Sequence, residues 1–208
     1  MNVYEKTVLH ISHIEEHTDL LGPGRRFVLW VHGCCFDCEG CLAQNTRFGP
    51  YETIGIDKLS DRIDASGCEG ITVSGGEPFL QAAALKQLIH AVRARRDIGV
   101  IVYSGFTLAE IQADDALSPL LGDIDILIDG RYVKKLDDGR PYVGSSNQVI
   151  HYLTPRYIKA GRNYYSSGKR RAEIKLTPTQ AILIGVPSPA ALHVWQEIKQ
   201  KGGGTHDF

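Results

Sequence analysis

The sequence predicts an α/β fold with a largely parallel sheet, formed by a single domain. Short β-branched and apolar runs recur along the chain, and segments with helical spacing of apolar residues separate them. This alternation is typical of βα units. The chain has 208 residues, of which 43% are hydrophobic and 23% charged, and this is enough to bury one sizeable core.

Four apolar runs predict the strands of this sheet. They are short, rich in β-branched residues, and each leads directly into a polar or cysteine-containing motif. The spacing between them leaves room for crossover helices, which parallel strands require. The runs cover residues 26–31, 70–73, 98–103 and 124–128.

Helical patterns fill the intervals between these runs. One helix is expected to begin near Asp57, and the next, which extends towards Arg96, carries apolar residues at helical spacing. Thr107 and Glu110 have the spacing of a capping box, which predicts the start of a third helix. Pro189, preceded by a serine, predicts the first turn of the last helix.

Residues 131–170 support loops and short strands more than any long element. We assign residues 1–201 to the domain. Over residues 202–208, where three consecutive glycines occur, we expect a flexible tail.

A cysteine motif follows the first predicted strand. Cys34, Cys38 and Cys41 form the pattern C-x3-C-x2-C. Three thiolates on one short loop can ligate three irons of a [4Fe–4S] cube and leave the fourth iron open to a substrate or cofactor. The motif therefore predicts chemistry at a cluster, beyond electron storage.

Other ligand sets remain open at this point. Cys35 can replace Cys34 in a C-x2-C-x2-C pattern, although we favour Cys34. A zinc site would need His32 or Cys35 as the fourth ligand, and no second ligand pair follows. Cys68 lies in an unrelated segment and is expected to be a small buried hydrophobic residue.

Polar motifs follow the predicted strands at four places. The cysteine loop, Gly75-Gly76-Glu77, Ser104 and Asp129 each come directly after a strand. In a parallel sheet or barrel these positions gather at the carboxyl edge, where ligands bind. The sequence therefore predicts one common site at this edge.

The cysteine loop, followed after the second strand by Gly75-Gly76-Glu77-Pro78, resembles the radical S-adenosylmethionine enzymes. The run from Gly22-Pro23-Gly24 to Gly33-Cys34 resembles the signature of the activases of glycyl radical enzymes. The resemblance extends from about residue 8 to about residue 187. Three more motifs are similar to those of activating proteins of anaerobic ribonucleoside-triphosphate reductase, at residues 103–107, 125–130 and 144–148.

This resemblance implies a set of cofactors and contacts. The three cysteines of the motif would hold a [4Fe–4S] cluster, whose open iron would bind the amino and carboxylate groups of S-adenosylmethionine. Gly75, Gly76 and Glu77 would position the methionine amino group. Ser104 and Asp129 would contact the methionine or ribose portion.

The resemblance also implies a fold and an activity. The fold would be a partial (β/α) barrel of the radical S-adenosylmethionine type, open on one side. Reductive cleavage of S-adenosylmethionine would yield a 5′-deoxyadenosyl radical, which takes a hydrogen atom from a glycine of a partner enzyme. The favoured partner is anaerobic ribonucleotide reductase, and a flavodoxin or ferredoxin would supply the electron. The alternative is a radical enzyme that modifies a nucleoside, an RNA or a peptide directly.

The net charge of −1 is unevenly distributed along the chain. Residues 131–175 carry eleven Lys and Arg against three Asp and Glu, together with six of the nine tyrosines. Such a stretch can be a nucleic-acid surface, a docking face for an acidic protein, or a solvated surface with structural tyrosines. A nucleic acid is not the favoured partner.

The composition also indicates the cellular compartment in which the protein is expected. No apolar run approaches the roughly 20 residues needed to span a bilayer, and the amino-terminal segment contains acidic residues, unlike a signal peptide. Crowded free thiols indicate a reducing compartment. We therefore expect a cytoplasmic protein without a membrane partner.

Overall fold

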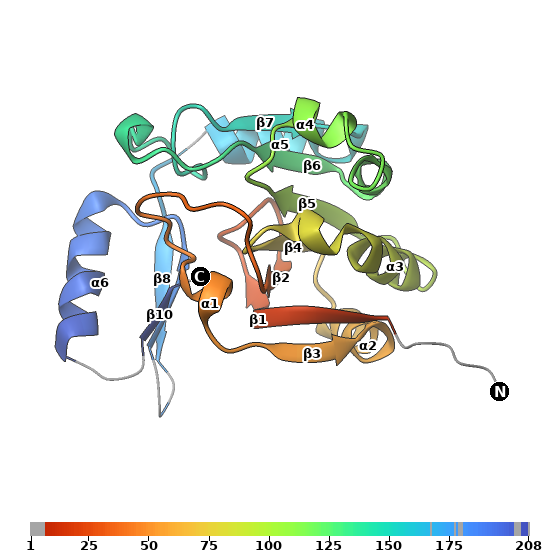
Figure 1. The fold of residues 1–208 in the computed structure, drawn as a ribbon, viewed down its shortest axis with the longest axis horizontal. Coiled ribbons are helices and arrows are strands. Elements are labelled where there is room, and N and C mark those ends of the chain that lie inside the picture. Colours follow the sequence, from red (N-terminus) through yellow and green to blue (C-terminus); the bar gives the residue numbers. More distant parts are fainter. Residues whose placement is uncertain (1–6, 167, 177, 179–180, 202–204, 208) are drawn as a thin grey trace.

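The computed structural model describes residues 7–166, 168–176, 178, 181–201 and 205–207. Its main sheet has seven strands in the order β3-β1-β2-β4-β5-β6-β7, and a second sheet has the order β10-β9-β8. Figure 1 shows the second sheet and helix α6 beside the main sheet, at one side of the molecule. The predicted α/β class, with a largely parallel main sheet, is confirmed.

The four predicted strands form the parallel centre of the main sheet. They pair with one another in chain order. Nearly all of their residues are buried, because other segments pack on both faces, as is usual for parallel strands. The strands are β2 (Arg26–Val31), β4 (Gly70–Gly75), β5 (Gly99–Tyr103) and β6 (Ile126–Asp129).

Antiparallel strands extend this centre at both sides. β1 pairs with β2 and with β3, and β7 pairs with β6. The sequence analysis did not predict β1 and β3, whereas β7 lies in the range 131–170, where short strands were expected. Many residues of these three strands are only partly buried or exposed. The strands are β1 (Val8–Thr18), β3 (Glu52–Gly55) and β7 (Val149–Tyr152).

Helices α2 (Ile56–Ser66) and α3 (Ala82–Arg93) cover one face of the main sheet (Figure 1). Their apolar faces pack against alternate residues of the central strands in the largest core cluster. Cys68 is fully buried in this cluster, as expected. The predicted capping box is present at α4 (Leu108–Gln112). The remaining short helices are α1 (Asn45–Phe48) and the 3₁₀ helices Pro78–Gln81, Ser118–Asp123, Lys134–Leu136 and Pro155–Tyr157.

Tyrosines pack on the opposite face of the sheet. Ile101 of β5 and Ile126 of β6 lie in one core cluster with Tyr142, Tyr157 and Tyr165, and the last of these belongs to α5 (Ile158–Ser166). Tyr152 and Tyr164 pack against the same cluster. Five of the six tyrosines of the basic stretch therefore belong to this core cluster or pack against it, which favours the structural interpretation over a stacking surface for nucleic acid.

Ion pairs neutralise much of the positive charge of the basic stretch. The acidic partners come from several parts of the chain, including the cysteine loop and β1. The pairs are Arg131–Glu110, Lys134–Glu39, Arg140–Asp138, Arg156–Asp97, Arg170–Asp137 and Lys175–Glu15.

The second sheet lies outside the set of strands that the sequence predicted. β9 pairs with β8 in antiparallel and with β10 in parallel orientation. Figure 1 shows α6 on the side of this sheet that faces away from the main sheet. The elements are β8 (Ala172–Leu176), β9 (Ala181–Gly185), α6 (Pro189–Lys201) and β10 (Thr205–Asp207).

Side chains of strand β9 pack the second sheet against the main sheet. Ile182 and Ile184 pack against Trp30 of β2, in a cluster on the inner face of the main sheet. Leu183 points to the other side of the second sheet and packs with the fully buried Trp195 of α6. The second sheet therefore covers part of the inner face of the main sheet.

The flexible tail expected over 202–208 remains a prediction. Within this segment, Thr205–Asp207 form β10, which pairs in parallel with residues 181–183 of β9. The other residues of that segment lie outside the described part of the chain.

Arg26 is a fully buried cation at the start of β2. Its guanidinium donates hydrogen bonds to Thr72 Oγ1 at 3.0 Å and to the Tyr157 hydroxyl at 2.7 Å. It also donates to the carbonyl oxygens of Ile71 and Gly99. These acceptors lie on β4, on β5 and beside α5, so that one side chain links the parallel strands to the tyrosine cluster.

We expect Tyr157→Phe to lower the free energy of unfolding by about 1–3 kcal/mol, because it leaves a buried guanidinium N–H without its acceptor. Urea unfolding measures this. Tyr51→Phe is the matched control, since Tyr51 is 51% exposed. Equal effects of the two substitutions would show that the Arg26 contact contributes little.

Candidate functional site

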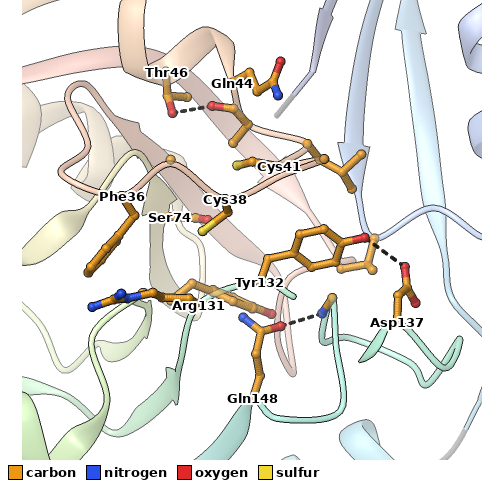
Figure 2. Close-up of a pocket in the computed structure, with 18 of the residues that line it drawn as sticks. Phe36, Cys38, Cys41, Gln44, Thr46, Ser74, Arg131, Tyr132, Asp137 and Gln148 are labelled. Carbon is orange, nitrogen blue, oxygen red and sulfur yellow. Dashed lines mark hydrogen bonds between the residues drawn. The ribbon is translucent and has the colours of Figure 1, made fainter. Parts of the chain in front are cut away.

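A cavity of about 920 Å³ lies at the carboxyl ends of the parallel strands. Its wall includes Cys34, Cys38 and Cys41, together with residues that follow β4, β5 and β6. Figure 2 shows Cys38 and Cys41 on one side of this space and Arg131, Tyr132 and Gln148 on the other. The predicted gathering of strand-end motifs is therefore found at one edge of the sheet.

Glycines fix the start of the cysteine loop. Gly33 has a φ of +91°, which favours glycine, and its amide donates to the carbonyl of Thr46 at 2.8 Å. A Cβ on Gly76 would lie 1.9 Å from the Gly33 carbonyl oxygen. That oxygen accepts a hydrogen bond from the Glu77 amide at 2.8 Å. The loop after β2 and the turn after β4 are thus packed backbone to backbone.

The three motif cysteines are partly buried beside the cavity, whereas Cys35 is exposed and is not among the lining residues. Burial raises the pKa of Cys34 to about 11 and also raises that of Cys41. Without a metal these groups are therefore thiols, and a metal must displace their protons.

Among the described residues, no three His, Cys, Asp or Glu side chains converge closely enough to hold one metal ion. The three thiols instead border a shared cavity from one loop. This distribution fits a cluster in which each sulfur ligates a different iron.

Salt bridges and a cation–π contact tie the cysteine loop to its surroundings. Asp37 pairs with Arg47, and Glu39 accepts from Lys134 at 2.9 Å. The guanidinium of Arg131 lies 4.4 Å from the centre of the Phe36 ring. Sequence reasoning missed Arg131, although its position directly after the Asp129-Gly130 strand end was a usable signal.

Only some of the predicted cosubstrate residues line the cavity. Gly75, Gly76 and Ser104 do, together with the cysteines. Glu77 is fully buried, and Asp129 is 4% exposed. Neither carboxylate is among the residues that form the wall.

The Glu77 carboxylate joins the ends of β4 and β5. It accepts hydrogen bonds from Ser104 Oγ at 2.9 Å, from the Phe79 amide at 2.9 Å and from the Gly105 amide at 2.7 Å. Burial raises the pKa of this carboxyl group, while these donors act in the opposite direction. Two residues predicted to contact the cosubstrate thus contact one another.

Asp129 has a similar role after β6. Its carboxylate accepts from the Leu108 amide at 2.6 Å, at the start of α4, and lies 3.0 Å from His151 Nε2. The contact satisfies a free amide of the first helical turn. Asp129 therefore anchors the first turn of α4 to the end of β6.

The motif at residues 144–148 stabilises the side of the cavity that lies opposite the cysteine loop (Figure 2). Gln148 accepts from the Gly144 amide at 2.7 Å and donates to the Gly130 carbonyl at 2.8 Å, and Asn147 donates to the Arg131 carbonyl at 2.8 Å. Ser145, fully buried, accepts from the Val133 amide. The motif thereby fixes the backbone from 130 to 133 beside the cavity.

The second sheet completes the wall. Gly185, Val186, Pro187, Pro189 and Leu192 line the cavity, from the end of β9 into α6. Sequence reasoning did not include them, because no motif in this segment indicates a ligand.

Comparisons with known proteins agree with these features. A family model described as a 4Fe-4S single cluster domain matches residues 20–151. The anaerobic ribonucleoside-triphosphate reductase-activating protein of Vibrio cholerae is 36% identical over 143 residues, which cover 64% of this chain and 91% of that protein. The chain belongs to the family of radical S-adenosylmethionine activases.

Other family members are similar over different lengths. The anaerobic ribonucleoside-triphosphate reductase-activating protein of Salmonella typhi is 35% identical over 144 residues, covering 64% of this chain and 91% of that protein. The pyruvate formate-lyase-activating enzyme of Staphylococcus epidermidis is 34% identical over 94 residues, covering 41% of this chain and 37% of that enzyme. The activase described here is accordingly an enzyme whose cofactors are a [4Fe–4S] cluster and S-adenosylmethionine.

The family match ends before the second sheet. The cysteine loop and the strand-end motifs lie within residues 20–151, whereas β8, β9 and α6 lie beyond them. In the described part of the activase, no helix is long and apolar enough to cross a membrane.

The raised pKa of Glu77 has a consequence for stability. Over a pH range above about 4.5 the folded activase retains this proton when the unfolded chain has lost it, so this group's contribution to the free energy of unfolding falls as pH rises. Glu77→Gln cannot titrate. Relative to wild type, its free energy of unfolding should therefore increase with pH, by about 1.4 kcal/mol per unit of pKa difference.

Urea unfolding of both proteins from pH 4.5 to about 8 tests this effect. Glu52→Gln, on the exposed Glu52 of β3, is the control. Curves of Glu77→Gln and wild type that run parallel would contradict the expectation.

Proposed function

We propose that this activase generates a glycyl radical on a partner enzyme, and that the partner is an anaerobic ribonucleotide reductase. The observation that carries the proposal is the C-x3-C-x2-C loop, which borders the same cavity as the glycine turn after β4. The relatives named as reductase-activating proteins support the choice of partner.

In this proposal, Cys34, Cys38 and Cys41 each ligate one iron and leave the fourth corner of the cluster facing the cavity. The exposure of Cys35, away from the cavity wall, supports the choice of Cys34 over Cys35. When bound, the cluster and S-adenosylmethionine supply one-electron radical chemistry that no amino-acid side chain provides.

The chain's own groups orient the cosubstrate and shield it. Gly75 and Gly76 present backbone without side chains at the cavity, and Ser104, which directly follows β5, lines the same cavity. Glu77 and Asp129, whose carboxylates are already bonded to neighbouring segments, act on the cosubstrate by holding these strand ends in place. The apolar turn before α6 limits access of water.

A flavodoxin or ferredoxin is the proposed electron donor, because cluster potentials reach roughly −700 mV and reduction needs a low-potential protein. Free, crowded cysteines support a reducing, cytoplasmic setting. Direct modification of RNA is not proposed, since five of the six tyrosines of the basic stretch belong to a core cluster or pack against it.

Anaerobic reconstitution with iron and sulfide, followed by dithionite and S-adenosylmethionine, tests the activity. We expect methionine and 5′-deoxyadenosine as products, and a glycyl radical signal in electron paramagnetic resonance when the reductase is added. Cleavage of S-adenosylmethionine without a glycyl radical on the reductase would exclude this partner. Absence of cleavage would exclude the proposed radical chemistry.

Substitution of single cysteines tests the ligand set. Cys38→Ala should abolish cluster assembly, since two thiolates cannot hold the cube, whereas Cys35→Ala should retain it. Iron and sulfide content and the visible spectrum of both variants measure this. Loss of the cluster in Cys35→Ala with retention in Cys34→Ala would show that Cys35 is the ligand.

A further inference from the structure

We infer that Tyr132 is the platform on which the adenine base of S-adenosylmethionine stacks. Tyr132 lines the cavity together with the motif cysteines, and no motif of the sequence assigns it a role. The inference concerns the cosubstrate, so it does not depend on which partner the activase modifies.

The position of Tyr132 follows from the end of β6. The chain turns at Gly130, whose φ of +99° favours glycine, and the next two residues extend along the cavity. Figure 2 shows the Tyr132 ring between the cysteine loop and Gln148, with its hydroxyl towards Asp137. The ring thus lies across from Cys38 and Cys41.

Two glycines lie close to this ring. A Cβ on Gly144 would lie 2.7 Å from Tyr132 Cδ2, and a Cβ on Gly40 would lie 3.6 Å from Cε1, on the other side of the ring. Gly40 belongs to the cysteine loop, and Gly144 to the opposite loop. The absence of side chains at both positions leaves room for the ring between the loops.

A chain of polar contacts holds the ring in this orientation. The Tyr132 hydroxyl donates to Asp137 Oδ2 at 3.3 Å, and Asp137 pairs with Arg170, whose side chain is 5% exposed. Arg170 also donates to the Gly144 carbonyl at 3.0 Å. A ring fixed before binding loses little conformational entropy when a ligand stacks on it.

The other aromatic residues at the cavity are already engaged. Phe36 and Phe48 each have an arginine guanidinium over the ring, at 4.4 and 4.6 Å from the ring centres. Trp30, Tyr103 and Tyr142 pack in core clusters. Tyr132 is left as the ring suited to a planar ligand.

The chemistry of S-adenosylmethionine matches such a platform. Its adenine is planar, and stacking of a base on an aromatic side chain is worth about 1–3 kcal/mol by alanine substitution. The cavity of about 920 Å³ is near the upper end of ligand pockets, so it can hold the nucleoside beside the cluster.

Binding of S-adenosylhomocysteine and of methionine alone, measured by calorimetry on the anaerobically reconstituted holoprotein, tests the inference. Tyr132→Ala should weaken binding of S-adenosylhomocysteine by about 10- to 100-fold and leave that of methionine within about twofold. Tyr132→Phe, which keeps the ring, should stay within about threefold of wild type. Leu176→Ala, at a side chain that is 79% exposed and outside the cavity wall, is the control.

Gly144→Ala is an independent variant, because its new Cβ must displace the Tyr132 ring without removing any group from the cavity. This substitution should also weaken the binding of S-adenosylhomocysteine more than the binding of methionine. Unchanged affinity in Tyr132→Ala, or equal loss for both ligands at unchanged iron content, would overturn the inference. Failure of the wild type to bind S-adenosylhomocysteine would overturn the cosubstrate assignment itself, and the role of Tyr132 with it.

Discussion

The geometry of the site depends on one close backbone approach between Gly33 and Gly76. The Glu77 amide donates to the Gly33 carbonyl, and the Gly76 amide donates to the Val31 carbonyl, both at 2.8 Å. No side chain fits between these segments, since a Cβ on Gly76 would overlap the Gly33 carbonyl. The cysteine loop is therefore attached directly to the end of β4, and a cluster bound by the loop stays at a fixed place relative to the sheet.

Buried carboxylates extend this attachment to the neighbouring strands. Glu77 bonds to Ser104 and to the Gly105 amide, and Asp129 bonds to the first turn of α4. Neither side chain lines the cavity, and their carboxyl oxygens accept hydrogen bonds from backbone amides. Motif residues that resemble cosubstrate ligands thus also determine how accurately the strand ends are aligned, and alignment matters because radical chemistry needs close contact between reacting atoms.

The carboxyl-terminal part of the activase gives the cavity its outer boundary. β9 packs Ile182 and Ile184 against the inner face of the main sheet, and the turn that follows supplies Val186 and Pro187 to the wall. Arg170, which precedes this sheet, holds Asp137 and the Gly144 loop. The family match, over residues 20–151, includes the cysteine motif. A segment that lies beyond this match therefore contributes to the shape of the same site.

The sequence by itself determined the α/β class, the four parallel strands and the cysteine motif, because apolar runs, helical periodicity and closely spaced ligands are written in contiguous residues. Only the tertiary structure decided that Glu77 and Ser104, 27 positions apart, bond to each other, and that Tyr132 lies opposite the cysteines. It also decided that a second sheet covers the inner face. These features depend on contacts between segments that are distant in the sequence, and a local sequence pattern does not determine which of these segments pack together.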